Sequence, residues 1–533
     1  MTLAAQLRIY AGFLRGLPEF VRHPISLDTA TRAIERRLAD RENGFVRFAQ
    51  TILLASPRSP YPLLFRAAGC DPRDLPQLIR DNGLDAALLA LRAAGVYVSF
   101  EEFKGRTPLV RNGQEIALQQ SDFANPFLSQ SYGSTTSGST GTPRHASTAL
   151  GHLSLQAEHR LAALSAHGLL GAPSAIWRPI LPAGSGLNNV LRAARIGQPP
   201  QRWFVQEGGR SALRFRVATA AAIAVGRMAG APLPWPETIA FSEAAGIARW
   251  MAGQRDAHGR VWLNTTVSCG VRVAIAAVKS GIDLTGATFF VAGEPATAAK
   301  VDRIRASGAD HFTDYGTVET GRIAIGCAHP KGSSDLHLLA DAFAVVPWTS
   351  TAPRAEDGLT SFHVTTFHPE SPTLLLNVEL DDEGIIDQKP CGCPLESMGL
   401  HTHLRDVRSY GKLTGEGVTL VGSDMVRILE EVLPDQFGGS PLDYQLLEEE
   451  DENGFTRLML IASPGIKASD QALRDAVLGS LSRASGAADA AQTVWRHAGT
   501  LQVRRSNPLV SERGKQPSFR PLKAIAKAAS ERQ

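Results

Sequence analysis

The residues Thr136-Ser-Gly-Ser-Thr-Gly-Thr-Pro-Arg144 are the most informative stretch of the sequence. Glycines and small hydroxyl residues let backbone N–H groups approach an anion closely, and the hydroxyl groups add further donors. Arg144 contributes a fixed positive charge. The stretch therefore suits a bound polyphosphate, although a flexible linker has a similar composition. It is not a Walker loop, because the Gly-Lys-Ser/Thr ending is missing.

The size and composition of the chain limit what surrounds this loop. With 533 residues the chain is too long for one compact core, so two or three domains are expected. Hydrophobic residues make up 43% and charged residues 20%, which is typical of a soluble globular protein. The 55 basic and 52 acidic residues leave a net charge of +3, which gives no electrostatic argument for a nucleic-acid partner.

Cysteine usage and hydropathy indicate a cellular location. The five cysteines are few and odd in number, which argues against a disulfide framework. Arg8, Arg15 and Arg22 interrupt residues 1–24 at helical spacing, so an amphipathic helix is expected there and not a signal peptide. The most apolar stretch, residues 217–225, is shorter than the ~20 residues of a membrane span. We therefore expect a cytoplasmic protein with no membrane span, and a homodimer is compatible with these features.

The order of apolar runs predicts an α/β fold. Helical patterns dominate residues 1–120, and from residue 121 short apolar runs alternate with helical patterns. Residues 174–181, 288–292 and 342–346 are expected to form buried strands, with a helix over 296–307. Strands that alternate with helices indicate layered α/β sheets.

A second, smaller unit is expected at the C-terminal end. Three glycines in the polar stretch 406–417 suit a hinge. After it the pattern restarts as an α+β unit of about 120 residues, the size of a small domain. The expected elements are a helix over 425–433, strands over 444–449 and 457–462, a helix over 469–483 and a strand over 500–504. We place the boundary at residue 409, with 1–409 as the large domain and 410–533 as a mobile lid.

The loop of residues 136–144 matches a family motif throughout. It resembles the phosphate loop of the adenylate-forming superfamily, which includes acyl-CoA ligases, peptide-synthetase adenylation domains and luciferases. The resemblance implies an adenylation domain followed by a mobile lid, with ATP and Mg²⁺ as cofactors. It also implies that the phosphates of ATP, and AMP after the reaction, are bound by Thr136, Ser137, Gly138, Ser139, Thr140, Gly141 and Arg144.

Further motifs follow in the family order. Tyr315-Gly-Thr-Val-Glu319 is similar to the family's Tyr-Gly-x-Thr/Ser-Glu, in which the tyrosine lies by the adenine and the glutamate helps to hold Mg²⁺. Gly316 and Thr317 belong to the same nucleotide contact by this resemblance. Val318 departs from the pattern, and Thr317 or Thr320 could supply the missing hydroxyl. Gly293, Glu294 and Pro295 resemble the Gly-Glu-Pro that borders the base in the phenylacetate–CoA ligase branch.

The resemblance also identifies a ribose-binding carboxylate and a hinge. Asp382 in Val378-Glu-Leu-Asp-Asp-Glu-Gly384 matches the family's ribose aspartate, with Asp381 as the alternative. A carboxylate suits a vicinal diol because it can accept two hydrogen bonds. Arg408 and Ser409 match the branch's Gly-Arg-Ser-Asp-Asp hinge, and the resemblance also assigns Arg408 to ATP and AMP binding. Tyr410 and Gly411 replace the aspartates of the hinge motif.

The C-terminal stretch Ser511-Glu-Arg-Gly-Lys515 resembles the family's catalytic lysine loop. The resemblance assigns Lys515 to bridge the substrate carboxylate and the α-phosphate, while Glu319 is the second catalytic residue. An ammonium group suits this position because negative charge builds up on phosphorus in the transition state.

Two clusters of metal-ligand residues stand downstream of the nucleotide motifs. Three thiols and an imidazole in tight pairs suit tetrahedral Zn²⁺, and similar pairs occur in the phenylacetate–CoA ligase branch. His337 and His401 are alternative fourth ligands, and buried reduced thiols are the alternative to any metal. The expected structural zinc ligands are Cys327, His329, Cys391 and Cys393.

The acid and its acceptor are less specified. The acid pocket is expected at Gly186, Asn188, Asn189 and Asp314. Asn188 or Asn189 falls near the position where relatives carry an aromatic residue or a histidine, and this polar substitution favours a hydroxylated or aminated aromatic acid. The resemblance implies an acyl-AMP intermediate and coenzyme A as acceptor. An amine, a hydroxyl or a carrier protein is the alternative acceptor, and a non-catalytic nucleotide-binding relative is the alternative of another class.

Overall fold

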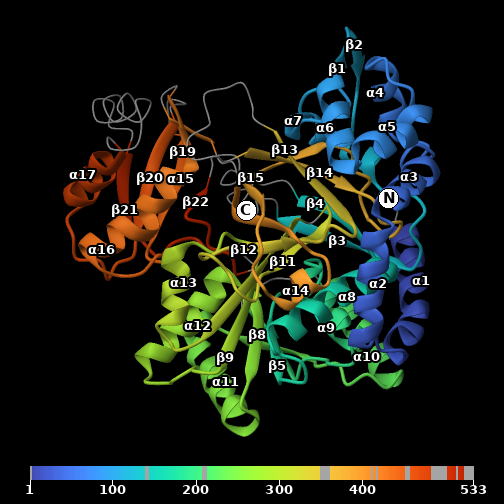
Figure 1. Cartoon of the computed structure of the whole chain (residues 1–533). Coiled ribbons are helices and arrows are strands. Elements are labelled where there is room, and N and C mark those ends of the chain that lie inside the picture. Colours follow the sequence, from blue (N-terminus) through green and yellow to red (C-terminus); the bar gives the residue numbers. More distant parts are fainter. Residues whose placement is uncertain are drawn as a thin grey trace.

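The computed structural model describes residues 3–137, 143–206, 213–317, 319–348, 360–409, 412–415, 418–450, 456–481, 501–511 and 514–520. All structural statements below refer to these residues. They fold into a large mixed α/β body and a small C-terminal sheet (Figure 1). No helix in the described ranges combines the length and the apolar character that crossing a membrane requires.

Helices dominate the first hundred residues, as the sequence predicts. Phe13 and Leu17 of the first helix are fully buried, which confirms an amphipathic helix packed on the body. The Ser26 side chain accepts a hydrogen bond of 3.2 Å from the Thr29 N–H and so caps the second helix. The helices are α1 (Leu3–Arg22), α2 (Leu27–Ala39), α3 (Arg41–Phe48), the π-helical η1 (Ala49–Leu53), α4 (Tyr61–Ala67), η2 (Pro72–Asp74), α5 (Leu75–Asn82), α6 (Leu84–Ala94) and α7 (Phe100–Phe103).

A sheet of twelve strands forms the centre of the large body. Its order is β13-β14-β15-β16-β12-β11-β10-β9-β8-β5-β6-β7, and the last six of these strands are parallel while the others pair antiparallel. The bounds are β5 (Ser174–Trp177), β6 (Arg202–Gln206), β7 (Pro236–Ile239), β8 (Val261–Thr266), β9 (Ala287–Ala292), β10 (Asp310–Thr317), β11 (Gly321–Gly326), β12 (Asp335–Leu338), β13 (Phe343–Trp348), β14 (Thr360–Thr366), β15 (Val378–Gln388) and β16 (Thr402–Ser409).

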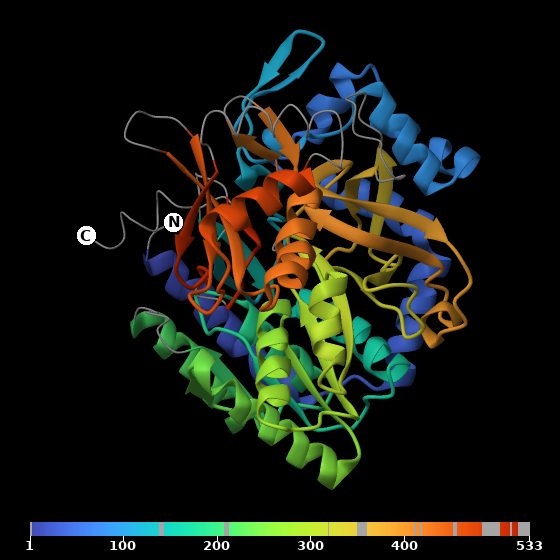
Figure 2. The same ribbon diagram turned by 90° about the vertical axis from the view of Figure 1, so that its left-hand side faces the viewer.

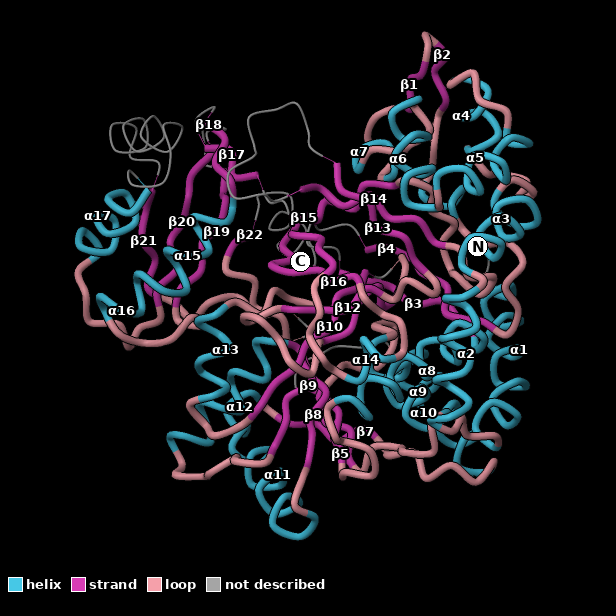
Figure 3. The backbone as a smooth tube through the Cα atoms, viewed as in Figure 1, coloured by secondary structure: helices cyan, strands magenta, loops and turns pink. Residues whose placement is uncertain are grey.

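The predicted strands at 174, 288 and 342 are confirmed as β5, β9 and β13. Strand β5 is shorter than expected and ends before Arg178, because Pro179 has no N–H to continue the ladder. Helices pack against this sheet (Figure 3). They are α8 (Leu150–Ala166), α9 (Ser185–Arg195), α10 (Leu213–Met228), η4 (Phe241–Glu243), α11 (Ala244–His258), α12 (Val267–Lys279), α13 (Ala298–Arg305) and α14 (Pro394–Ser397).

Short hairpins complete the large body. The two ends of the stretch 136–144 lie on a pair of antiparallel strands, β3 (Ser131–Ser137) and β4 (Pro143–Ala149), in which Thr136 pairs with Arg144. A second hairpin is formed by β1 (Leu109–Arg111) and β2 (Gln114–Ile116), and η3 (Gln120–Phe123) follows it.

The C-terminal elements form a second sheet, ordered β21-β20-β19-β22. The expected helix–strand–strand–helix–strand order is confirmed, and the helices and strands bury a core of their own around Tyr444, Leu446 and Leu460. The boundary at residue 409 stays a prediction, since Tyr410 and Gly411 lie outside the described residues. The elements are β17 (Lys412–Gly415), β18 (Val418–Val421), α15 (Gly422–Arg427), the π-helical η5 (Ile428–Val432), α16 (Leu433–Phe437), β19 (Tyr444–Glu450), β20 (Thr456–Ala462), α17 (Asp470–Leu481), β21 (Leu501–Arg505) and β22 (Phe519–Arg520).

The small sheet packs against the large body beside α12 and α13 (Figures 1 and 2). A buried ion pair crosses this contact, with the Lys300 Nζ 2.7 Å from the Glu430 Oε1 and both side chains at most 3% exposed. The hydroxyls of Thr297 and Ser518 also donate to the Glu430 carboxylate. Arg303 donates to the Gly439 carbonyl at 3.0 Å. These contacts hold the C-terminal elements against the large body in this structure.

Candidate active site

Two of the predicted nucleotide motifs, those of Gly293 and Tyr315, lie at one edge of the large sheet. Strands β5, β8, β9 and β10 are parallel, so their carboxyl ends lie side by side. Arg178, Thr266, Gly293 and Tyr315 stand at or just beyond these ends. In open α/β sheets this edge is where ligands bind.

The Gly-Glu-Pro turn directly follows β9. Gly293 has a φ of +87°, a left-handed conformation that favours glycine. The Glu294 carboxylate accepts hydrogen bonds from the Ser268 N–H at 2.8 Å and from its hydroxyl at 2.9 Å, at the start of α12. It also accepts one of 2.8 Å from the Gln516 N–H. Glu294 therefore joins this turn to the C-terminal segment through protein contacts.

The C-terminal lysine stands in a tight turn. The Ser511 N–H donates to the Lys515 carbonyl at 2.8 Å, and the Lys515 N–H donates to the Ser511 hydroxyl at 3.0 Å. Gly514 has a φ of +75°, and a Cβ there would lie 2.5 Å from the Cys269 Sγ. The turn thus sits so close to α12 that only glycine fits at this position.

The Lys515 side chain lies against Gly293. A Cβ built on Gly293 would stand 3.2 Å from both the Cε and the Nζ of Lys515 and 3.8 Å from a guanidinium nitrogen of Arg178. The absence of a side chain at Gly293 lets the ammonium group reach the sheet edge. The structure therefore brings together two motifs that are 222 residues apart and adds a second cation, Arg178, beside them.

The residues predicted for adenine and ribose also meet. The Tyr315 hydroxyl on β10 donates to the Asp382 Oδ2 on β15 at 2.7 Å. Burial, followed by the adjacent Asp382 carboxylate, raises the pKa of the Tyr315 phenol well above its ordinary value, so it stays a donor. Phe362 packs edge-on against the Tyr315 ring, with the centroids 6.3 Å apart.

Glu319 has a partner that the sequence did not indicate. The Lys104 Nζ lies 2.8 Å from the Glu319 Oε1, and both side chains are at most 7% exposed. The Gln120 amide donates to the same oxygen at 3.1 Å. A carboxylate is a suitable Mg²⁺ ligand, but an ion at Glu319 would compete with the Lys104 ammonium group for it. Thr317 and Thr320 lie beside Glu319 with their hydroxyls 3.0 Å apart.

The residues predicted to line the acid pocket are described, and most of them contact other protein groups. The Asn188 side chain bonds to the Tyr132 hydroxyl, and the Asn189 Oδ1 accepts a hydrogen bond of 2.6 Å from Arg160. Asp314 forms an ion pair with Arg322. Gly186 does not face open space, because a Cβ there would meet the Pro179 carbonyl oxygen at 2.3 Å and the Trp203 ring at 2.5 Å.

Several predicted residues are described only in part. Gly138, Ser139, Thr140, Gly141 and Val318 lie outside the described residues. For Thr136, Ser137, Arg144 and Arg408 the structure gives the strand pairing alone, and Arg408 on β16 pairs with Glu383 on β15. Their contacts with ATP remain predictions.

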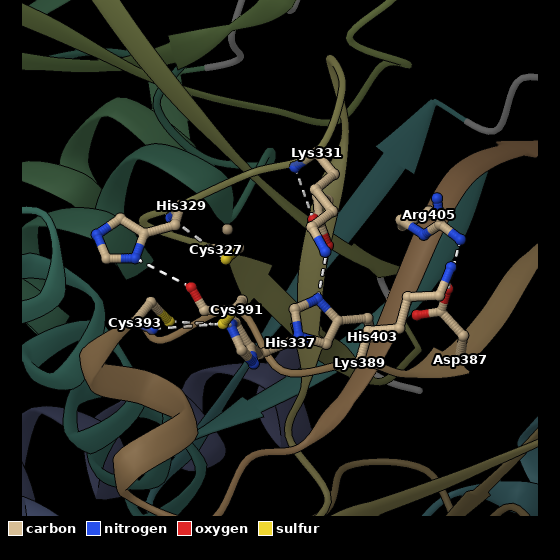
Figure 4. A network of polar contacts seen from close by, with 12 residues as sticks. Cys327, His329, Lys331, His337, Asp387, Lys389, Cys391, Cys393, His403 and Arg405 are labelled. Atoms are coloured by element: carbon tan, nitrogen blue, oxygen red, sulfur yellow. Dashed lines mark hydrogen bonds and ion pairs between the residues drawn. The ribbon is translucent and has the colours of Figure 1, made fainter.

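A thiol–imidazole cluster lies at the far end of β11 and β12 from this edge. One candidate ligand atom from each of Cys327, His337, Cys391 and Cys393 lies within 4.8 Å of the other three (Figure 4). Tetrahedral Zn²⁺ with Zn–S bonds of ~2.3 Å needs ligands about 3.8 Å apart, so the spacing fits this metal. His329 is not one of the four, since its Nδ1 lies 3.2 Å from the Cys391 carbonyl oxygen.

Hydrogen bonds around the cluster orient its ligands. The His337 Nδ1 lies 2.6 Å from the Leu400 carbonyl, which can only accept, so this nitrogen carries the proton. The Nε2 lone pair then faces the Cys393 Sγ at 3.1 Å and the Cys391 Sγ at 3.6 Å. This is the usual arrangement of a metal-binding histidine. The backbone N–H groups of His329 and Cys393 donate to the sulfurs of Cys327 and Cys391 at 3.3 and 3.4 Å.

Sequence reasoning missed Lys104 and Arg178 as active-site residues. Arg178 directly follows a buried strand, and a charged residue at that position could have been recognised as an edge residue. Lys104 carries no such signal, because it lies in the short segment after α7 and reaches Glu319 only through the tertiary fold.

No family model matches the chain, and no curated protein matches it in sequence. Among solved structures it is similar to 2-hydroxyisobutyryl-CoA ligase in the postadenylation state, in complexes with the adenylates named 2-HIB-AMP and R3-HIB-AMP. Each has a TM-score of 0.53 at 14% identity, with 96% of this chain and 93% of the ligase covered. The chain therefore has the fold of an adenylate-forming CoA ligase, as the resemblance of its motifs predicts.

Proposed function

We propose that this protein activates a carboxylic acid with ATP to form an acyl adenylate and then transfers the acyl group to an acceptor, coenzyme A in the first instance. The observation that carries the proposal is the approach of Lys515 to Gly293 at the carboxyl ends of β5 and β9. The paired Tyr315 and Asp382 lie on β10 and β15 of the same sheet.

The chemistry follows from the charges at this edge. A carboxylate oxygen of the acid attacks the α-phosphorus of ATP, the new P–O bond forms, and the bond to pyrophosphate breaks with its electron pair leaving on pyrophosphate. Lys515 offsets the negative charge that builds up around phosphorus, and Arg178 is close enough to share this role. Both reactants are anions, so positioning them against their repulsion supplies much of the rate.

The remaining groups bind and orient the nucleotide. Asp382 is proposed to accept hydrogen bonds from the ribose diol, and the Tyr315 ring to lie by the adenine. Glu319 would hold Mg²⁺, which offsets phosphate charge when bound. Lys104 would then give up its contact with the Glu319 carboxylate oxygen. In the second step the thiol of coenzyme A attacks the acyl carbon and AMP leaves. An amine, a hydroxyl or a carrier thiol would react in the same way.

Acid-dependent exchange between pyrophosphate and ATP tests this proposal. We expect labelled pyrophosphate to enter ATP only when a suitable acid is added, because exchange requires reversal of adenylate formation. A panel of aromatic, aliphatic and dicarboxylic acids should be used with the full chain. If no acid supports exchange while ATP still binds, the adenylation proposal is wrong. Adding coenzyme A, amines or a carrier protein to the active mixture then identifies the acceptor.

We also propose that Cys327, His337, Cys391 and Cys393 hold a structural Zn²⁺. The support is the four-ligand spacing together with the hydrogen bond that fixes the His337 tautomer. Four protein ligands leave no open position, so the metal would brace β11, β12 and the segment before α14 and would not take part in the reaction.

The metal content of two histidine variants tests this ligand set. The purified protein is expected to contain one zinc per chain, and His337→Ala should lose it and melt several degrees lower, because the metal cross-links segments over 60 residues apart. His329→Ala is the matched control and should keep the metal. Loss of zinc from His329→Ala with retention in His337→Ala would reverse the assignment, and a stable wild-type protein without metal would refute the site.

A further inference from the structure

Four arginine side chains are buried together behind the sheet edge. Arg160 on α8, Arg178 after β5, Arg192 on α9 and Arg322 on β11 are 0%, 7%, 8% and 6% exposed. We call these four residues the arginine cluster. A buried charge without a counter-charge costs several kcal/mol, so a group of four needs an explanation.

Two members of the arginine cluster are bound by neutral groups only. Arg160 donates to the backbone carbonyl of Asn189 at 3.0 Å and to its side-chain oxygen at 2.6 Å. Arg192 donates to the side-chain oxygen of Gln156. Amide oxygens satisfy the N–H groups in part, but they do not neutralise the charge.

The other two members differ in their counter-charge. Arg178 donates to the Asn264 side chain at 3.3 Å and to the Thr265 carbonyl. Arg322 is the member with an ion pair among the described residues, and its partner is Asp314. Asp314 and, more weakly, Glu294 also act on Arg178 from a distance, but the Glu294 carboxylate is already bound by Ser268 and Gln516.

Donor atoms in the cluster are left without a partner. The Nε of Arg160, the Nε of Arg192 and one terminal nitrogen of Arg322 are buried and have no hydrogen-bond partner within the described part of the chain. Burial, followed by repulsion from Arg322, lowers the pKa of Arg192 to about 9, so it still carries its charge at neutral pH. Unpartnered buried donors next to excess positive charge form a site suited to an anion.

This site coincides with the predicted acid pocket. Arg160 binds Asn189, Arg322 binds Asp314, and Arg192 stands one helical turn after Asn188 on α9. Arg178 approaches the Gly293 position where Lys515 stands, so the cluster begins near the reacting carboxylate. Its other members lie on α8, α9 and β11, where Arg160 and Arg322 bond residues predicted to line the acid pocket.

We infer that the acid carries a second anionic group, a carboxylate or an oxyanion of similar charge, which binds Arg160, Arg192 and Arg322. The inference rests on the proposed adenylation function and names its substrate class. The carboxylate that reacts is already served by Lys515 and Arg178. The three remaining guanidinium groups face a single carboxylate, Asp314, and a monocarboxylic acid would leave this excess positive charge buried.

Matched pairs of acids test the inference. Pyrophosphate exchange should be compared for succinate against butyrate, adipate against hexanoate and isophthalate against benzoate. In at least one pair the diacid should have a kcat/KM about 10- to 100-fold higher, the factor of one or two charge-assisted hydrogen bonds. 3-Sulfobenzoate in the same assay distinguishes a second carboxylate from a non-carboxylate anion. Higher kcat/KM for the monoacid throughout the pairs would overturn the inference.

Variants and a binding readout separate this result from the proposed function. Arg192→Met should lower kcat/KM for the diacid about 10-fold more than kcat/KM for the matched monoacid, and so lose the preference for the diacid. Arg322→Met gives a second test should the first variant fail to fold. Arg195→Met on the same helix is the control, since Arg195 bonds the Phe20 and His23 carbonyls outside the cluster. Thermal stabilisation by each acid without ATP is measured in parallel. Diacid stabilisation without exchange would keep the site and refute adenylation, whereas exchange with monoacids alone would do the reverse.

Discussion

Replacing Lys515 by alanine is expected to lower the rate of adenylate formation by about 10²- to 10³-fold, the usual loss when one preorganised charge-stabilising group is removed. The ammonium group acts on charge that builds up only in the transition state. Binding of ATP should therefore change by no more than a few-fold. The measurement is single-turnover formation of acyl-AMP with the best acid of the exchange panel, alongside ATP binding by calorimetry.

Two controls make the Lys515 result specific. Lys467→Ala removes an exposed lysine from the same C-terminal elements and should leave the rate unchanged. The Lys515→Ala protein should still convert a supplied acyl-AMP to the thioester, because the second step does not pass through the α-phosphorus. An unchanged adenylation rate in Lys515→Ala would remove this residue from the mechanism. Equal loss of both steps would indicate a damaged fold.

The sequence predicted which residues lie at the sheet edge, but it did not predict which other residues those side chains contact. The family motifs identified Gly293, Tyr315, Asp382 and Lys515, and the structure brings these together in two groups at one edge. The fold class followed from the alternation of strands and helices, because that pattern reflects which faces are buried. Such local patterns carry no information on the tertiary contact between Lys104 and Glu319, which are 215 residues apart.

The thiol–imidazole cluster illustrates the same limit. Cys327 and His329 suggested a pair of metal ligands, because only one residue separates them in the sequence. In the structure His337 on β12 points its Nε2 toward the thiols, because pairing of β11 with β12 brings it alongside Cys327 and the Leu400 carbonyl fixes its ring. The register of β11 against β12 determines which histidine lies beside the three cysteines, and the spacing of candidate ligands in the sequence does not reveal that register.

The side chains around the predicted acid pocket change which acid is expected to bind. Asn188 and Asn189 alone favoured a hydroxylated or aminated aromatic acid. The structure places Arg160 and Arg192 beside these asparagines, and two buried cations outweigh the neutral amides in deciding which ligand is favoured. The substrate expectation therefore shifts from neutral polar groups on the acid to a second negative charge.

The buried ion pair between Lys300 and Glu430 is expected to control the first half-reaction. Glu430→Gln should lower adenylation by about 100-fold or more, because loss of one partner leaves an uncompensated buried charge worth about 3–5 kcal/mol. The predicted lid movement would relieve this cost, because the C-terminal elements would then leave the large body without unfolding. Lys515 would leave the sheet edge with them, since the same elements hold its turn against Glu294 and Ser268.

A double variant tests whether the two residues act as a pair. Lys300→Met combined with Glu430→Gln should recover part of the lost rate, because neither buried charge remains and the interaction energy of contacting residues is not additive. Arg305→Met on the same helix breaks the exposed pair with Asp302 and should have no effect, as exposed pairs contribute ~0–1 kcal/mol. Thioester formation from supplied acyl-AMP should stay within a few-fold of the wild-type rate in Glu430→Gln, because this step does not need Lys515 at Gly293. A parallel fall of both half-reactions with the melting temperature would reduce the ion pair to a purely structural contact.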